Sequence, residues 1–277
     1  MITTNRVRDW GREYLQTILL IAVIVINLRF NIPEFINRVT TDASVPVSDL
    51  PVEWRFAIGS GRWILLIVVF VIVFLFVRRS NKEFVLKQSV SDAIIWHPYV
   101  GYAYCRYVLN IKQISLTRVP IPMQFKLIWE NLFVSYECLE GVTEKEKGTD
   151  NIELGQFNNE PYTSTINLVL ADTYPLDWKS KLPASTLNLT TIVIDRKGEK
   201  GVRYYSKDFV AKIATTIHEL PSYVTTINLF ATINAAHCYH ITKEVFMTGG
   251  RDNIKHLFVY EQTKGSWVFE GKRIKVF

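Results

Sequence analysis

Apolar residues are concentrated in two long runs near the start of the chain. The first extends from Leu15 to Leu28 with three polar interruptions, and the second, Trp63 to Val77, is fifteen residues without a polar side chain. Spanning a bilayer takes about 20 residues at about 1.5 Å each, so each run reaches that length only with its flanks. We therefore predict two transmembrane helices, at about residues 10–30 and 56–77.

The distribution of Lys and Arg predicts the orientation of this hairpin. The external loop between the two runs holds four basic residues mixed with acidic ones, whereas seven basic residues flank the hairpin on its other side: Arg6, Arg8, Arg12, Arg78, Arg79, Lys82 and Lys87. Basic flanks stay on the cytoplasmic side, so both termini are expected there. The chain then divides into a membrane hairpin (1–87) and a cytoplasmic domain (88–277). A pair of buried core helices, or of β-branched core strands, is the alternative.

Beyond residue 160, short apolar runs alternate with segments of helical spacing. Such alternation at these lengths is typical of βαβ units, so we predict a membrane-anchored α/β protein with a Rossmann-like domain and a mainly parallel sheet. The polar stretch 140–160 is predicted to be a loop. The predicted strands are 166–171, 190–194, 225–231 and 254–260, the predicted helices are 206–220 and about 235–247, and 267–277 is expected to add an edge hairpin.

Two of the predicted strands end in polar residues. The first is followed by Asp172-Thr173-Tyr174 and the third by Thr232-Ile233-Asn234. In open parallel sheets, ligands bind beyond the carboxyl ends of the strands, near the point where strand order reverses. The second of these ends is also a predicted helix N-terminus, where free N–H groups favour phosphate.

Charge and composition limit the class of ligand. Of the net charge of +6, +4 lies in residues 1–87 and only +2 in the rest. The cytoplasmic part thus lacks the uniform basic excess that long duplexes attract, and a bound nucleotide is expected to be small. With 48% apolar residues the 277-residue chain is too apolar to be disordered, and its three scattered cysteines suit a reducing cytosol.

Enzymatic motifs are absent from the sequence. It contains no GxSxG, GxxxxGK[ST], GxGxxG or HExxH pattern. His237 and His240 lie one helical turn apart, but without a second pair of ligands a metal site is not favoured. We expect no catalytic residue, no metal and no cofactor. An enzyme acting on a bound nucleotide, such as a ring-type nuclease, is the disfavoured alternative.

The C-terminal segment resembles a known family of nucleotide sensors. Residues 227–236 (INLFATINAA) and 257–261 (LFVYE) are similar to the end of the SAVED domain, a relative of the CARF sensors of CRISPR systems. Asn234 stands where that family usually has Pro. With two membrane helices, the arrangement resembles two-transmembrane SAVED effectors of bacterial cyclic-oligonucleotide (CBASS) antiphage defence, or the Hailong effector.

This resemblance implies a function in the bacterial inner membrane. A cyclic or short linear oligonucleotide, made by a nucleotidyltransferase encoded nearby, would bind the cytoplasmic domain and gate a pore. A second resemblance is to STING cyclic-dinucleotide domains, through residues 96–102 (WHPYVGY) and 196–206 (RKGEKGVRYYS). The long C-terminal STING helix is missing, so this ranks second. The competing class is a membrane scaffold that does not conduct.

The nucleotide site is predicted at the two polar strand ends. Asp172 is expected to accept a hydrogen bond from a base edge or ribose hydroxyl, Tyr174 to stack on a base, and the N–H groups of Asn234 to Ala236 to meet a phosphate. Each also has an ordinary structural explanation, such as Asp172 capping a turn. The predicted ligand-binding residues are Asp172, Thr173, Tyr174, Lys179, Arg203, Thr232, Asn234, Ala235 and His237.

The predicted pore requires several copies of the chain. Two packed helices enclose no lumen, so a conducting assembly needs three or more copies, with a tetramer favoured. Gln16, Thr17 and Asn27 are the polar residues inside the first run, and polar groups facing lipid are costly, so we expect them to line the pore. The uniformly apolar second run is expected to face lipid.

Overall fold

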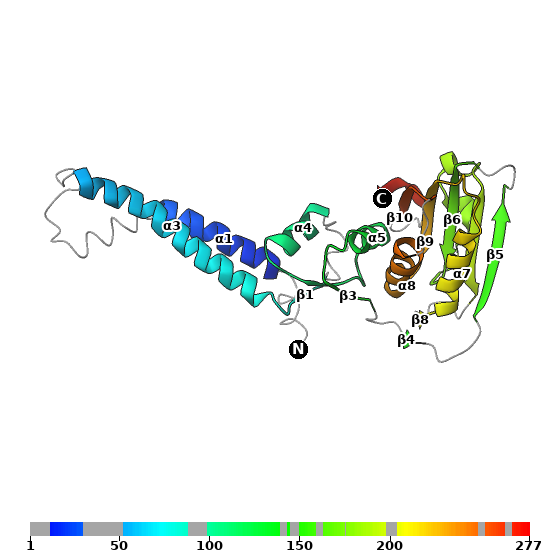
Figure 1. Ribbon diagram of the computed structural model, residues 1–277, viewed down its shortest axis with the longest axis horizontal. Coiled ribbons are helices and arrows are strands. Elements are labelled where there is room, and N and C mark those ends of the chain that lie inside the picture. The colour runs from blue at the N-terminus through cyan, green and yellow to red at the C-terminus, as the bar shows by residue number, and fades with distance from the viewer. Residues whose placement is uncertain are drawn as a thin grey trace. The chain divides into compact units, whose positions relative to one another are not determined.

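The protein is described by a computed structural model (Figure 1), which places residues 12–29, 52–87, 99–138, 143–144, 150–158, 163–174, 176–197, 204–248, 253–263 and 268–277. The chain divides into two compact units. The first comprises residues 1–84 and 100–112, and the second comprises residues 85–99 and 113–277.

The first unit is built on two long helices, α1 (Arg12–Arg29) and α3 (Val52–Ser80), which lie side by side (Figure 1). They are antiparallel, since Arg12 at the start of α1 donates a 2.7 Å hydrogen bond to the carbonyl of Ser80 at the end of α3. Both apolar runs therefore form helices as predicted. A third helix, α4 (Tyr99–Tyr107), follows in this unit from residue 100.

The two long helices differ in their fitness to cross a membrane. By length and composition, the described residues contain one candidate span, Trp63–Ser80 of α3, and only 6% of it is buried. That low burial argues against the alternative of a soluble core helix. The 18 residues of α1 include Arg12, Glu13 and Arg29, and α1 does not pass the same criterion. The predicted pair of membrane-spanning helices is thus supported by composition for α3 alone.

The second unit is organised around a six-stranded sheet with the order β11-β10-β9-β6-β7-β5. The four inner strands are parallel and the two outer ones antiparallel, which confirms the predicted mainly parallel sheet. The strands are β5 (Asn151–Phe157), β6 (Thr165–Ala171), β7 (Thr191–Lys197), β9 (Thr226–Thr232), β10 (His256–Gln262) and β11 (Phe269–Lys275).

Helices cover the two faces of this sheet unequally. One face carries the larger core, to which α7 contributes Phe209 and Ile213 and the segment after β9 contributes Cys238 and Ile241. The helices of this face are α5 (Ile121–Trp129), α7 (Lys207–His218) and α8 (Ala235–His240), the last continuing as the π-helix η4 (Ile241–Met247). The other face is covered by the short helices α6 (Trp178–Lys181) and η3 (Ala184–Thr186), over a smaller core around Phe230.

Two small parallel sheets complete the second unit. The first has the order β1-β2-β3 and the second pairs β4 with β8. Their strands are β1 (Val85–Leu86), β2 (Gln113–Ser115), β3 (Ser135–Glu137), β4 (Thr143–Glu144) and β8 (Tyr204–Tyr205).

Local capping explains why the predicted helices form where they do. Ser206 caps α7, because its hydroxyl oxygen accepts a 3.1 Å hydrogen bond from the Phe209 amide, as N-cap serines do. The single helix predicted over 235–247 begins at Ala235 but changes to π geometry at Ile241. Thr242 donates a 2.6 Å bond from its hydroxyl to the Cys238 carbonyl at this junction.

Two sequence predictions for this unit were wrong. The polar stretch 140–160 is not all loop, since it contains β5, an edge strand whose exposed side chains are polar. An edge strand that faces water carries little apolar signal. Strand β7 also continues beyond residue 194, its predicted end, through Asp195 and Arg196 to Lys197.

The strand order places the switch point of the sheet between β6 and β9. From β6 the chain crosses over the α6 face to β7, then over the α7 face past β6 to β9. The chain therefore leaves the carboxyl ends of these two neighbouring strands toward opposite faces. Ligands bind at this point in open α/β sheets.

Candidate ligand site at the carboxyl edge of the sheet

The two polar strand ends singled out in the sequence lie next to each other. Ala171 of β6 is paired with Thr232 of β9. The Thr173 amide donates a 3.0 Å hydrogen bond to the Thr232 carbonyl, and the Thr232 hydroxyl donates a 3.3 Å bond to the Tyr174 carbonyl. The predicted adjacency of these ends is confirmed, since the loops are bonded to each other before the chain parts to the two faces.

Asp172 is the centre of a buried polar cluster. One of its oxygens, Oδ1, receives the Nε–H of Arg196 at 2.5 Å and also pairs with Nη2 of the same guanidinium. The other, Oδ2, lies 2.7 Å from Nδ1 of His237 and 3.2 Å from Nδ2 of Asn234. The Asp172 and His237 side chains have no exposed surface and that of Arg196 is 1% exposed. We call these four residues the Asp172 cluster.

The hydrogen bonds of the cluster determine the tautomer of His237. The backbone N–H of Ser206 donates a 2.9 Å bond to Nε2, so Nε2 carries no proton and the ring proton is on Nδ1, facing the Asp172 carboxylate. Asn234 holds this histidine from the other side as the N-cap of α8. Its Oδ1 accepts from the His237 amide at 2.9 Å, and its Nδ2 donates to the Tyr204 carbonyl at 3.0 Å.

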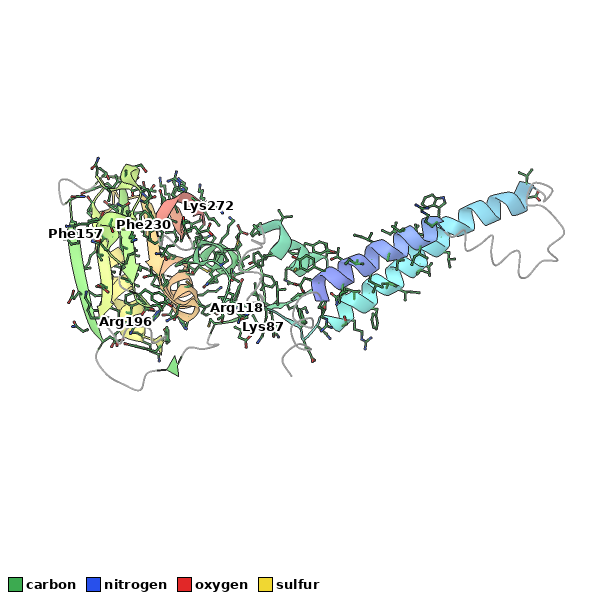
Figure 2. The ribbon with its side chains drawn as sticks, turned by 180° about the vertical axis from the view of Figure 1, so that it is seen from behind. Lys87, Arg118, Phe157, Arg196, Phe230 and Lys272 are labelled. Atoms are coloured by element: carbon green, nitrogen blue, oxygen red, sulfur yellow. The ribbon has the colours of Figure 1, made fainter. Side chains whose placement is uncertain are left out.

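Arg196 is held by stacking as well as by charge. Its guanidinium carbon lies 3.8 Å from the centre of the Tyr204 ring, so the cation contacts this ring as well as the Asp172 carboxylate. Figure 2 shows Arg196 at one end of the sheet, the end at which the parallel strands finish. Sequence reasoning missed Arg196 because residues 195–198 resemble a polar turn. In the structure the last residues of β7 alternate in burial: Asp195 is half-buried, Arg196 is buried and Lys197 is exposed.

Two buried donors at this edge have no acceptor among the described residues. They are Nη1 of Arg196 and the Thr173 hydroxyl. Arg196 is 3% exposed and Thr173 is 5% exposed. Register places Asp172 opposite Arg196, so the two donors come from adjacent strands next to the switch point. Buried polar groups are nearly always hydrogen-bonded, and an unpaired one calls for an explanation such as a ligand.

The remaining predicted site residues divide into two groups. Tyr174 is half-exposed (52%) beside the cluster, and Ala235 is the buried first residue of α8. Arg203 lies outside the described residues. Lys179 is not brought to the Asp172 cluster. Its ammonium lies over the Phe157 ring at 5.5 Å, and Phe157 pairs with Thr191, about 16 Å along β7 from Arg196. Figure 2 shows Phe157 and Arg196 at opposite ends of the sheet.

The cysteine and histidines of α8 are not poised for catalysis or metal binding. Burial raises the pKa of the Cys238 thiol well above its ordinary value, and the nearby Asp172 carboxylate raises it further. The thiol is therefore protonated at neutral pH and a poor nucleophile. His237 is turned into the Asp172 cluster, whereas His240 pairs with Glu244 at 2.6 Å. The described residues contain no group of three side chains suited to a metal.

The predicted pore residues of α1 have partners in the first unit. Gln16 and Asn81 exchange two amide hydrogen bonds of 2.9 and 2.8 Å, and the Thr17 and Tyr104 hydroxyls are 2.9 Å apart. The Asn27 side chain lies outside the described part of the structure. The argument from uncompensated polarity thus no longer applies to Gln16 and Thr17.

A family model spans the whole chain. The SMODS- and Ubiquitin system-associated 2TM effector domain matches residues 1–277. The chain belongs to this family. The membership confirms the sequence-based resemblance to two-transmembrane effectors of antiphage defence, the first of the two resemblances drawn. The 2TM in the family's description suggests a membrane protein.

Comparisons with individual proteins are less informative than the family model. Two solved structures similar to the effector are of the Acinetobacter baumannii Cap4 SAVED/CARF-domain receptor. The complex with 2'3'3'-cAAA has 10% identity and a TM-score of 0.38, covering 58% of this chain and 37% of the receptor. The complex with 3'3'3'-cAAA has 8% identity and a TM-score of 0.40, covering 68% and 44%. The effector thus spans less than half of the receptor's length. A comparison with curated proteins gave no match.

Proposed function

We propose that this two-transmembrane effector is a receptor for a small oligonucleotide messenger in antiphage defence, and that it responds by changing the permeability of the bacterial inner membrane. Family membership supports an effector acting at a membrane. The messenger, cyclic or short and linear, is supplied by a nucleotidyltransferase encoded nearby. The effector is a receptor and not an enzyme, which agrees with the protonated Cys238 thiol and the tied His237 ring.

The observation that carries the messenger site is the pair of buried donors at the switch point. Arg196 Nη1 and the Thr173 hydroxyl lack acceptors among the described residues. Phosphate oxygens and the acceptor atoms of base edges are complementary to such donors. Tyr174, exposed beside them, offers an aromatic ring on which a base can stack. In this proposal Asp172 orients Arg196 and does not contact the ligand.

The membrane part of the proposal is a pore made by several copies. Both α1 and α3 cross the bilayer, with both chain termini cytoplasmic because the flanks rich in Arg and Lys stay there. Two helices enclose no aqueous path, so a homo-oligomer of at least three copies, with a tetramer favoured, is required. Of the polar positions in α1, Asn27 is the one we place toward the lumen.

The first experiment is to identify and titrate the ligand. Mass spectrometry of small molecules that co-purify with the full chain reveals the messenger class. Calorimetry in nanodiscs then measures binding of a panel of cyclic di- and trinucleotides that includes 2'3'3'-cAAA and 3'3'3'-cAAA. Thr173→Val removes a hydroxyl that has no partner among the described residues, so the fold is retained while affinity falls at least about tenfold.

A matched variant separates the site from general effects. Thr190→Val alters a threonine that is also buried, directly before β7, and that donates from its hydroxyl to the Asn158 carbonyl at the far end of the sheet. This variant is expected to leave affinity unchanged. Arg196→Lys keeps the charge and removes Nη1, and is expected to weaken binding further. Unchanged affinity in Thr173→Val and Arg196→Lys, or no binding from the whole panel together with no co-purified nucleotide, would overturn the site.

A second experiment tests the pore. The number of subunits is measured for the full chain in nanodiscs with and without the identified nucleotide, and membrane depolarisation is followed in cells that express wild type and Asn27→Leu. An assembly of three or more copies and altered depolarisation in Asn27→Leu are expected. A stable monomer under both conditions would replace the pore with a non-conducting scaffold.

A further inference from the structure

Helix α4 carries apolar surface on two opposite sides. Its sequence, YVGYAYCRY, has a single charged residue, Arg106. Tyr102 and Cys105 are buried, whereas Val100 is 72% and Tyr107 is 66% exposed. Val100 and Tyr107 are seven residues apart, so they lie on one face of the helix. A helix in water normally turns polar residues to that face.

Hydrogen bonds fasten α4 to the ends of α1 and α3. The Tyr104 hydroxyl bonds Thr17, and Asn81 joins Gln16 to the Leu109 carbonyl just after α4, donating to that carbonyl at 2.9 Å. We call Gln16, Thr17, Asn81 and Tyr104 the collar. Beside it, Arg78 Nη1 donates to the Tyr107 and Val108 carbonyls at 2.6 and 3.1 Å. These bonds satisfy carbonyls that a helix end leaves free.

The collar sets the depth of α4 relative to the membrane helices. Arg12, Arg78 and Arg79 gather at the same end of the helix pair, where basic side chains meet lipid headgroups. Thr17 is five residues further along α1, which is about 7.5 Å toward the bilayer centre. Because the Tyr104 hydroxyl bonds Thr17, α4 lies beside that depth. Interfacial helices bury their apolar face about 5–10 Å into the same zone.

We infer that α4 lies in the membrane–water interface beside Arg12 and Arg78, with Val100 and Tyr107 in contact with lipid. The occupant of this face is the lipid leaflet, because hydrogen bonds hold α4 against α1 and α3, whose own apolar side chains are exposed. The inference rests on the proposed membrane crossing of these helices. Tyrosine is favoured at such interfaces, and Arg106 can extend its guanidinium to the headgroups.

This placement gives the receptor a route from the sensor to the membrane. The chain passes between the two units at residues 84–85, 99–100 and 112–113, and the last two crossings flank the α4 segment. A displacement of the second unit on binding its ligand therefore reaches the bilayer through α4 and the collar as well as through the end of α3. Loss of the interfacial contact is expected to weaken that coupling.

The test uses spin labels on the full chain in nanodiscs of phosphatidylethanolamine and phosphatidylglycerol. Nitroxides are attached to Val100→Cys and Tyr107→Cys in a Cys138→Ser background, and their collision rates with oxygen and with a water-soluble nickel chelate are measured. Val134→Cys is the matched control, because Val134 is 68% exposed in the second unit. Ile67→Cys, on the 58%-exposed face of α3, reports the membrane crossing itself.

The outcomes separate the inference from the proposed function. Labels at positions 100 and 107 are expected to favour oxygen over the chelate at least about tenfold relative to position 134. Chelate access at 100 and 107, with position 67 still protected, would overturn the interfacial helix alone. Chelate access at 67 would overturn the membrane crossing. Exclusion of both reagents at 100 with dipolar broadening between labels would instead identify a second copy as the occupant.

Discussion

The collar of the first unit and the Asp172 cluster of the second are both sets of polar groups removed from water, yet they are built from different chemistry. The collar consists of neutral amides and hydroxyls paired one to one, as in the two bonds between Gln16 and Asn81. The Asp172 cluster contains a fully buried carboxylate and guanidinium, and one guanidinium nitrogen remains without an acceptor among the described residues.

The difference in charge between the two sites fits the surroundings of each. Burying a charge costs far more than burying an amide, so charges are retained inside proteins where paired or where they serve a ligand. Neutral pairs satisfy each other and need nothing further, which suits a fastening between helices near lipid. The collar therefore fastens the helices to one another, whereas the edge of the sheet beside the Asp172 cluster is where we propose that the ligand binds.

The largest effect is expected from removing the central charge. Asp172→Asn leaves the buried Arg196 guanidinium without its counter-ion, which costs about 3–5 kcal/mol. Hydrogen exchange of β6 and β9, measured by mass spectrometry in detergent, reports the loss. Asp195→Asn is the matched control, since Asp195 is 24% exposed and its pair with Lys197 is worth about 1 kcal/mol or less. Equal losses in the two variants would contradict a special role for the buried pair.

A smaller and cooperative effect is expected in the collar. Gln16→Leu leaves the fully buried Asn81 amide without this partner, and Asn81→Leu leaves the half-buried Gln16 amide without its partner, at a cost of about 1–3 kcal/mol each. The double variant removes both members of the pair, so its cost is expected to be less than the sum by about 1 kcal/mol or more. Thermal unfolding of the four proteins in detergent completes the cycle. Additive costs would mean that the two amides do not act as a pair.

The smallest effect is expected in the rate of thiol modification, which differs between the buried cysteines and the partly buried one. Burial raises the pKa of Cys105 to about 12, so at pH 8 roughly one molecule in ten thousand has this thiolate. Cys238 is buried as completely, whereas Cys138 is only partly buried. A thiol reagent is expected to modify Cys138 first, and the labelling rate is expected to rise with pH. Mass spectrometry of the labelled protein measures the rate at each cysteine. Fast modification of Cys105 would show that α4 does not stay packed.

Much of the architecture follows from local patterns. The two apolar runs form helices at nearly the predicted bounds, and the predicted strand 166–171 is β6 with one more residue at its start. Ser206, the first residue of the predicted helix 206–220, is the N-cap of α7. These features depend on periodicity and on neighbours within a few residues, which a single chain displays directly.

Strand register and long-range pairing decided the rest. Arg196 could not be found in the sequence because only the pairing of β6 with β7 brings it to Asp172. The contact of Lys179 with Phe157, at the other end of the sheet, likewise depends on the fold. Gln16 and Thr17 have no partner near them in the sequence, and their partners are Asn81, just after α3, and Tyr104 of α4, which lie 65 and 87 residues away. Which residues are polar, apolar or able to cap a helix can be seen in the sequence alone. Which polar groups meet depends on the fold, because hydrogen bonds and ion pairs depend on distance in space and not on spacing along the chain.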